Sequence, residues 1–242
     1  MGIITTGING QDGSYLAEYL LSLGYEVHGT VRRNSTSENQ SARLKPAIET
    51  GNNFAKTNIF THYGDLSDQG SIERLLEEIR PDEIYNIAAQ SHVRVSFDIP
   101  QYTVQTNAIG VLNVLEAYKR TCPTAKFYQA SSSEMFGLTV EDDGFHAMLN
   151  HDVADDFVVS TMKTHSVREM CDLVFKYLDL DYKDYIEQNP KFMRPEELPY
   201  LKGDSTKIRE TLKWKPKYTF ESMMHEMCDH WMDILQGKES LR

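Results

Sequence analysis

The sequence predicts an α/β fold in which helices cover both faces of a doubly wound parallel sheet. Short apolar runs rich in β-branched residues alternate with longer stretches of helical periodicity over the first two thirds of the chain. Hydrophobic residues make up 40% of the 242 residues and charged residues 25%, which is ordinary globular composition. This length suits one large domain with a small appendage.

The alternating elements follow one another in a regular order. Strands are expected at residues 3–6, 26–31, 58–63, 83–87, 126–129 and 157–160. Helices are expected at residues 14–23, 68–79, 103–119, 141–150, 167–178, 205–212 and 220–235. Gly24 ends the first helix and Pro81 follows the second, while a capping box of Ser166 and Glu169 begins the helix at 167.

The regular alternation of strand and helix patterns ends after residue 160, and the sequence pattern becomes irregular. We therefore expect a sheet domain over residues 1–160 and a small α-rich region over residues 161–242, resting on the C-terminal edge of the sheet. The apolar stripe of the last helix is expected to be core, and its members are Met223, Met224, Met227, Cys228, Trp231, Ile234 and Leu235.

A glycine motif lies directly between the first strand and the first helix. Gly7, Gly10 and Gly13 let the backbone turn tightly and approach a pyrophosphate, and the helix N-terminus offers free N–H groups to the anion. This context predicts a Rossmann-type dinucleotide-binding domain; the alternative is a glycine-rich turn with no ligand. The candidate cofactor-binding residues of this loop are Gly7, Asn9, Gly10, Gln11, Asp12 and Gly13.

The end of the second strand indicates which dinucleotide is bound. A site for NAD needs a carboxylate there, whereas this chain continues with Arg32, Arg33, Asn34 and Ser35. Two guanidinium groups match the 2'-phosphate of NADP in charge and geometry; the alternative is a solvated surface pair. Asp65, after the third strand, is placed to face an adenine amino group, although it could also be a helix cap.

Composition excludes several classes of partner. A formal net charge of −11 argues against nonspecific binding to nucleic acid, which needs a basic surface. The three cysteines lack the spacing of a zinc site or a disulfide framework, which favours a reducing cytoplasm. We expect no metal and no membrane span, and the first strand starts too close to residue 1 for a signal peptide.

With these motifs assembled, the chain resembles the GDP-mannose 4,6-dehydratases, which are extended short-chain dehydrogenases/reductases. The matching stretches are GINGQDGSYL at 7–16, VHGTVRRNS at 27–35, YGDL at 63–66, AAQSHV at 88–93, SFDIPQYT at 96–103, FYQASSSEMFG at 127–137, THSVRE at 164–169, RPEE at 194–197 and LKWKP at 212–216. The resemblance implies that NADP⁺ takes a hydride from the sugar's C4, water leaves across C5 and C6, and the hydride returns to C6.

The resemblance also assigns individual residues. Glu134 matches the family's acid/base at C5, and Ser132 matches the hydroxyl that orients the C4 oxygen. Further cofactor contacts are implied for Leu66, Ala88, Ala89, Gln90, Ser91 and Tyr102. Contacts with GDP-mannose or a related sugar nucleotide are implied for Thr164, Arg194 and Glu197, although Arg194 could simply be a surface residue.

One catalytic pair of the family is missing. The family's base at C4 is a Tyr with a Lys four residues later, and none of the thirteen tyrosines here has one. After Gly137 the family continues through a long block that carries this pair, whereas this chain goes directly to a helix at 141–150 that resembles one near the family's C-terminus. We therefore expect an internal deletion, with the strand at 157–160 moving into the vacated place.

Neither a substitute base nor a metal site is evident from the sequence. Lys163, Tyr182, Tyr185 and Tyr200 are better explained as packing or surface residues. His225, Cys228 and His230 do not share one helix face, as metal ligands would.

Two hypotheses follow from this pattern. The chain is either a working NADP-dependent lyase or a catalytically silent binding protein that pairs with a full-length dehydratase and modulates it. A homo-oligomer is also compatible with the sequence.

Overall fold

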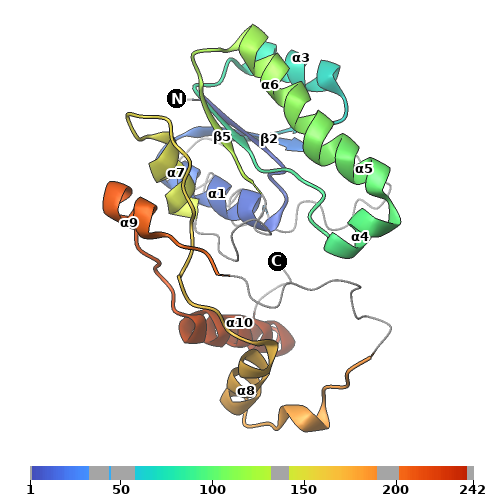
Figure 1. The fold of residues 1–242 in the computed structure, drawn as a ribbon, viewed down its shortest axis with the longest axis vertical. Coiled ribbons are helices and arrows are strands. Elements are labelled where there is room, and N and C mark those ends of the chain that lie inside the picture. Colours follow the sequence, from blue (N-terminus) through green and yellow to red (C-terminus); the bar gives the residue numbers. More distant parts are fainter. Residues whose placement is uncertain (1, 33–43, 45–57, 132–141, 190–201, 239–242) are drawn as a thin grey trace. The chain divides into compact units, whose positions relative to one another are not determined.

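The computed structural model describes residues 2–32, 44, 58–131, 142–189 and 202–238 of the chain (Figure 1). The described residues form two compact units. The first contains the chain up to Ser131 together with residues 142–154, and the second contains the chain from Asp155 onward.

The first unit is built on a parallel sheet of five strands. These are β1 (Gly2–Thr6), β2 (Glu26–Val31), β3 (Ile59–Tyr63), β4 (Glu83–Asn86) and β5 (Lys126–Gln129). Their order is β3-β2-β1-β4-β5, and every neighbouring pair is parallel. The order reverses at β1, so the loops after β1 and β4 diverge at a switch point, where open α/β sheets bind ligands.

Helices cover both faces of this sheet, as the sequence predicts (Figure 1). Ile3 of β1 packs in one apolar cluster with residues of α1 (Gln11–Ser22) and α7 (Asp142–Leu149). Ile4, the next residue, packs in the other cluster with residues of α3 (Gln69–Ile79) and α6 (Gly110–Thr121). Successive side chains of a strand point to opposite faces, so both faces are apolar and both are buried.

The helical segment between β4 and β5 is more complex than the single helix predicted at 103–119. It begins with α4 (Val93–Asp98) and α5 (Pro100–Val104). A turn of π-helix, η2 (Gln105–Ile109), then joins α5 to α6. Pro100 is suited to the start of α5, because the N–H that proline lacks would have no helical partner there.

The second unit contains α8 (Val167–Tyr177), the short 3₁₀ turn η4 (Tyr182–Asp184), α9 (Thr206–Leu212) and α10 (Phe220–Leu235). The capping box predicted for α8 is confirmed: the Ser166 hydroxyl accepts from the Glu169 N–H at 3.1 Å, and the Glu169 carboxylate accepts from the Ser166 N–H at 2.6 Å. Helices α8 and α10 contact each other through Tyr177, whose hydroxyl donates to Asp229 at 2.8 Å.

The strand predicted at 157–160 is wrong. These residues form no strand and belong to the second unit. Ser160 is buried, and its carbonyl accepts from the Ser205 hydroxyl at 2.6 Å and from Arg209 at 3.1 Å. The segment at the start of α9 therefore binds this stretch, and β5 has only one neighbour among the strands that the structure describes.

The prediction that the whole apolar stripe of α10 is core is also wrong. Met224 is buried, whereas Met223, Met227, Trp231 and Leu235 are exposed, Leu235 to 78%. Helical periodicity marks the residues that could be covered; in the described part of this unit α10 packs against α8, and these four side chains stay exposed.

Neither a membrane-spanning helix nor a metal-binding cluster is found in the residues that the structure describes. No helix there is both long and apolar enough to cross a bilayer. In the same residues, no three His, Cys, Asp or Glu side chains are grouped so that they could hold a metal ion.

Candidate functional site

The glycine loop after β1 is packed so closely that side chains would not fit. A Cβ atom on Gly13 would lie 2.4 Å from the carbonyl oxygen of Gly7, closer than real Cβ contacts. Gly7 has a φ of +71°, and a Cβ there would lie 3.1 Å from the Cα of Ala88. Gly7 therefore lies against Ala88 in the loop after β4, where a side chain would be crowded and the positive φ favours glycine.

The first turn of α1 is open to an anion. Its N-cap residue is Gly10, which has no side chain to cap the helix, so the N–H groups of the first turn have no side-chain acceptor from that position. The positive end of the helix dipole lies at the same place. Asp12 also lies in this turn, and burial raises the pKa of its carboxyl group.

The end of β2 approaches the same edge of the sheet. Gly29 lies under Ile8, because a Cβ on Gly29 would be 2.3 Å from the Ile8 side chain. Just after β2, the Arg32 guanidinium donates a hydrogen bond to the hydroxyl of Tyr102 on α5 and lies 6.0 Å from the centre of its ring. Two residues that were predicted separately as cofactor contacts are thus in contact with each other.

The loop after β3 is held by its own side chains. The Asp65 carboxylate accepts from the Ser67 N–H at 2.9 Å and from the Ser67 hydroxyl at 2.7 Å. The cap of α3 is Asp68, so the alternative explanation of Asp65 as a helix cap does not hold. Leu66 is buried, so it would contribute to a site through its backbone rather than its side chain.

In the loop after β4, Gln90 is held by hydrogen bonds of both its backbone and its side chain. Its backbone N–H and carbonyl both bind the side chain of Asn107 at 2.8 Å. Its side chain donates to Thr103 at 3.1 Å and accepts from the His92 N–H at 2.6 Å. Ala89 and Ser91 on either side of Gln90 are exposed, so this short loop is fixed at its centre.

Comparison with known proteins decides the family. A profile described as GDP-mannose 4,6 dehydratase matches residues 4–144 and 139–227. GDP-mannose 4,6 dehydratase 1 of Arabidopsis thaliana is 34% identical over 332 aligned positions, which cover 98% of this chain and 91% of that protein. This chain belongs to the GDP-mannose 4,6-dehydratase family. The human GDP-mannose 4,6 dehydratase is 29% identical, over 96% of this chain and 92% of its own length.

Solved structures of other sugar-nucleotide enzymes share the fold. The UDP-glucose 4-epimerase of Thermotoga maritima matches with a TM-score of 0.74 at 16% identity, covering 97% of this chain and 100% of that one. The dTDP-glucose 4,6-dehydratase of Bacillus anthracis, solved in complex with NAD, also gives 0.74, at 15% identity, with 98% of each chain covered. At such identities the likeness shows the Rossmann-like fold alone.

Most of the predicted catalytic and substrate residues lie outside the part of the chain that the structure describes. Ser132, Glu134, Arg194 and Glu197 lie outside the described residues, as do the predicted cofactor contacts Arg33, Asn34 and Ser35. Thr164 is described and is exposed in the segment before α8 of the second unit. Among the predicted cofactor contacts, the structure brings Gly7 next to Ala88 and Arg32 next to Tyr102.

The residues considered as substitutes for the missing base or as metal ligands have other surroundings. Tyr185 is 62% exposed, and the hydroxyl of Tyr182 accepts from Arg168 at 3.5 Å. Lys163 is exposed, and Tyr200 lies outside the described residues. The ring of His225 stacks on Tyr177 with 4.0 Å between centres, so packing accounts for it.

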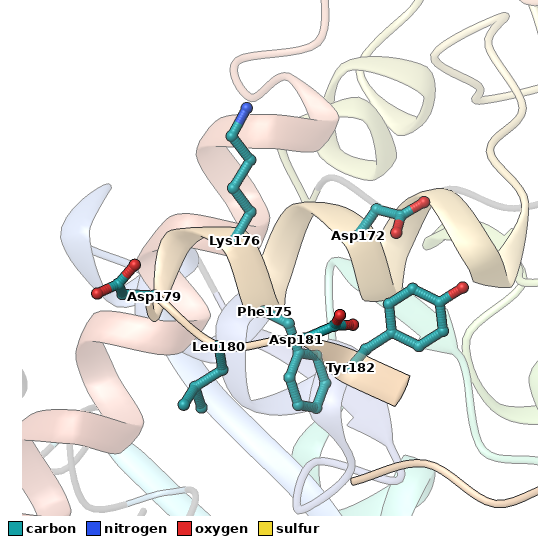
Figure 2. Close-up of a pocket in the computed structure, with 7 residues that line it drawn as sticks. All are labelled: Asp172, Phe175, Lys176, Asp179, Leu180, Asp181 and Tyr182. Atoms are coloured by element: carbon teal, nitrogen blue, oxygen red, sulfur yellow. The ribbon is translucent and has the colours of Figure 1, made fainter. Parts of the chain in front are cut away.

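The second unit has a hollow of its own, whose lining contains none of the predicted site residues (Figure 2). It has a volume of about 410 Å³ and is lined by Asp172, Phe175, Lys176, Asp179, Leu180, Asp181 and Tyr182. Figure 2 shows Phe175, Leu180 and Tyr182 on one side of α8 and Lys176 pointing away from them. Asp181 already caps η4 by accepting from the Lys183 N–H, so part of this acidic rim has a structural role.

Sequence reasoning missed two asparagines near the cofactor edge, Asn107 and Asn113. Asn113 on α6 donates to the carbonyl of Leu66 at 2.8 Å, just as Asn107 binds Gln90. The signal that could have revealed them is asparagine inside a predicted helix, where it is unfavourable unless its side chain has a specific partner.

Proposed function

We propose that this chain binds NADP(H) along the carboxyl edge of its sheet and that its dehydratase reaction is impaired or lost. The observation that supports binding is the glycine cradle: Gly13 and Gly7 occupy positions that a Cβ would fill, beside the uncapped N-terminus of α1. Such a cradle suits the pyrophosphate of a dinucleotide by both shape and charge.

The choice of NADP over NAD rests on Arg32. A site for NAD places a carboxylate after β2 to bind the ribose 2'-hydroxyl, and a cation at that position favours a 2'-phosphate instead. The hydrogen bond to the Tyr102 hydroxyl orients the guanidinium. When bound, NADP would supply the hydride acceptor, and the residues of the chain would supply its binding and orientation.

The proposed substrate is GDP-mannose or a related sugar nucleotide. Relatives over nearly the whole chain carry the name GDP-mannose 4,6 dehydratase. In this proposal Thr164, Arg194 and Glu197 contact the sugar nucleotide, Glu134 exchanges the proton at C5, and Ser132 orients the C4 oxygen. No residue has the position of the base that removes the proton from the C4 hydroxyl.

The loss of that base is the reason to propose impaired activity. The family profile matches in two stretches that meet at residues 139–144, and the alignment with the Arabidopsis relative has 332 positions against 242 residues in this chain. Both findings support an internal deletion after Gly137. Loss of a member of a catalytic unit lowers the rate by several orders of magnitude in well-studied enzymes, so the same is expected here.

The experiment that tests the proposal measures binding and turnover on the same preparation. NADPH binding is followed by fluorescence, and GDP-mannose is incubated with NADP⁺ at high protein concentration while mass spectrometry monitors loss of one water. We expect binding and little or no product. Product at a rate near that of a full-length family member, run in parallel, would overturn the proposed loss, and absence of NADPH binding would overturn the cofactor proposal.

A second candidate function is modulation of a full-length dehydratase. It is favoured by the retention of the cofactor residues without the Tyr-Lys pair, which is the pattern of a regulatory copy. Co-purification with a complete dehydratase, together with a change in its rate, would support this function. A chain that leaves such an enzyme's rate and oligomeric state unchanged would refute it.

A further inference from the structure

One helical segment, from Pro100 to Thr121, contacts three of the loops that follow strands of the sheet. Figure 1 shows α5 and α6 running along one line, with η2 joining them. The loops in question follow β2, β3 and β4, and each contains residues of the proposed cofactor site. The contacts are made by Tyr102, Thr103, Asn107 and Asn113, none of which belongs to the glycine loop. Of these four, only Tyr102 is itself a proposed cofactor contact.

The contact with the loop after β4 is reciprocal. The side-chain carbonyl of Asn107 accepts from the Gln90 N–H at 2.8 Å, and its amide donates to the Gln90 carbonyl at 2.8 Å. Thr103, one turn earlier, accepts from the Gln90 side chain at 3.1 Å. Both polar backbone groups of Gln90 are therefore bound by one side chain, as they would be by a neighbouring strand.

The contact with the loop after β3 depends on close approach. Asn113 donates to the Leu66 carbonyl at 2.8 Å. Gly110 allows α6 to come near enough, because a Cβ on Gly110 would lie 2.8 Å from the Cβ of Leu66. Asn113 and Gly110 thus fix the backbone next to Asp65, the residue proposed to face adenine.

The π turn lies between the residues that reach these loops. Tyr102 and Thr103 precede it, Asn107 is within it and Asn113 follows it. A π turn takes up an extra residue and so changes which side chains after it face a given direction; such turns are frequent at functional sites. It lies here within a continuous helical segment whose side chains contact the loops after β2, β3 and β4.

We infer that Asn107 and Asn113 are positioning residues, which fix the loops after β4 and β3 and so preorganise the cofactor site. The inference rests on the proposed binding of NADP(H). Neither side chain needs to touch the dinucleotide. A loop that is already ordered loses less conformational entropy when the ligand binds, so affinity falls when its support is removed.

The test uses Asn107→Ala and Asn113→Ala in the full chain, with Glu116→Ala on the exposed face of α6 as the matched control. In the cofactor-free protein we expect faster amide hydrogen exchange at residues 88–92 for Asn107→Ala and at residues 64–68 for Asn113→Ala. Each variant should weaken NADPH binding by about tenfold, the equivalent of one or two lost hydrogen bonds. Asn107→Asp, which keeps the acceptor but loses the donor, should lie between wild type and Asn107→Ala.

A merely structural role would produce a different pattern. It would lower the thermal midpoint of the cofactor-free protein and raise exchange throughout the unit, without partial rescue by Asn107→Asp. That pattern, or unchanged exchange at the two loops, would overturn the inference. If wild type binds no NADPH, the proposed function fails by that result alone, and the exchange data still decide whether the asparagines fix these loops.

Discussion

Replacing Arg32 with alanine should separate the two nicotinamide dinucleotides. Arg32 follows β2, is exposed, and is oriented by the Tyr102 hydroxyl and ring. Its guanidinium is proposed to bind the 2'-phosphate that NADPH has and NADH lacks. Arg32→Ala should therefore weaken NADPH binding while leaving NADH binding nearly unchanged.

The size of the effect follows from the surroundings of the guanidinium. A hydrogen bond to a charged group contributes about 1.5–3 kcal/mol, and solvent screening at an exposed site reduces this. We expect a loss of about 1–2 kcal/mol, which corresponds to about 5- to 30-fold weaker NADPH binding. Tyr102→Phe, which keeps the ring and removes the hydroxyl, should give a smaller loss in the same direction.

The assay is fluorescence titration of each variant with NADPH and NADH at two salt concentrations. Arg94→Ala serves as the control, because Arg94 is an exposed arginine on α4 whose charge pairs with Asp98 at 3.8 Å. Higher salt should shrink the NADPH preference of wild type, since an exposed charge pair is screened. Equal losses for both dinucleotides in Arg32→Ala would refute the assignment of the 2'-phosphate to this residue.

Three further predictions concern the fold and the cradle. Gly13→Ala should abolish measurable NADPH binding and lower the free energy of unfolding by about 1–3 kcal/mol, because the added Cβ would overlap the Gly7 carbonyl. Gly2→Ala is the control, because a Cβ there has free space, whereas Gly24 has a positive φ and is unsuitable. Equal effects of Gly2→Ala and Gly13→Ala would contradict the reasoning. Burial and the neighbouring His28 lower the pKa of His62; Arg74 acts in the same direction and Glu78 opposes it. Below a pH of about 6.5 the unfolded chain therefore binds more protons than the folded chain. The free energy of unfolding should fall as the pH drops from there toward the lower pKa of the folded state. Urea unfolding at several pH values measures this, and a His62→Gln variant with the same pH dependence as wild type would argue against it. Tyr85→Phe should destabilise the first unit by about 1–3 kcal/mol. The Tyr85 hydroxyl donates at 2.8 Å to the buried Glu83 carboxylate, whose other oxygen has no partner among the described residues. Unchanged urea unfolding of the variant would show that this hydrogen bond contributes little.

Local signals allowed most of the first unit, and the start of α8 in the second unit, to be predicted. The strands and the helix starts follow from short apolar runs and from caps such as Ser166 with Glu169, whose bonds form between residues close in sequence. The run at 157–160 has the same composition as a strand, yet its backbone binds Ser205 and Arg209, more than forty residues later. Composition cannot distinguish these partners from a neighbouring strand.

The part of the candidate site that could be predicted from the sequence is the glycine loop after β1. Gly13 is required by its local contact with the Gly7 carbonyl, and Gly7 by its positive φ, so their role could be inferred from spacing and context. The roles of Asn107 and Asn113 depend on loops 17 and 47 residues away, reached from a helix that contains a π turn. Such partners are set by tertiary packing, which the pattern of one sequence does not record.

The glycine loop and the proposed catalytic residues follow different strands of the sheet. The glycine loop follows β1, which is paired on both sides by β2 and β4, whereas the proposed catalytic residues Ser132 and Glu134 come shortly after β5, at the border of the described sheet. Segments beyond a border strand can be gained or lost in evolution while the interior strands keep their register. A lineage can thus lose the segment expected after Gly137 while β1 keeps both of its neighbours and the glycine loop keeps its shape.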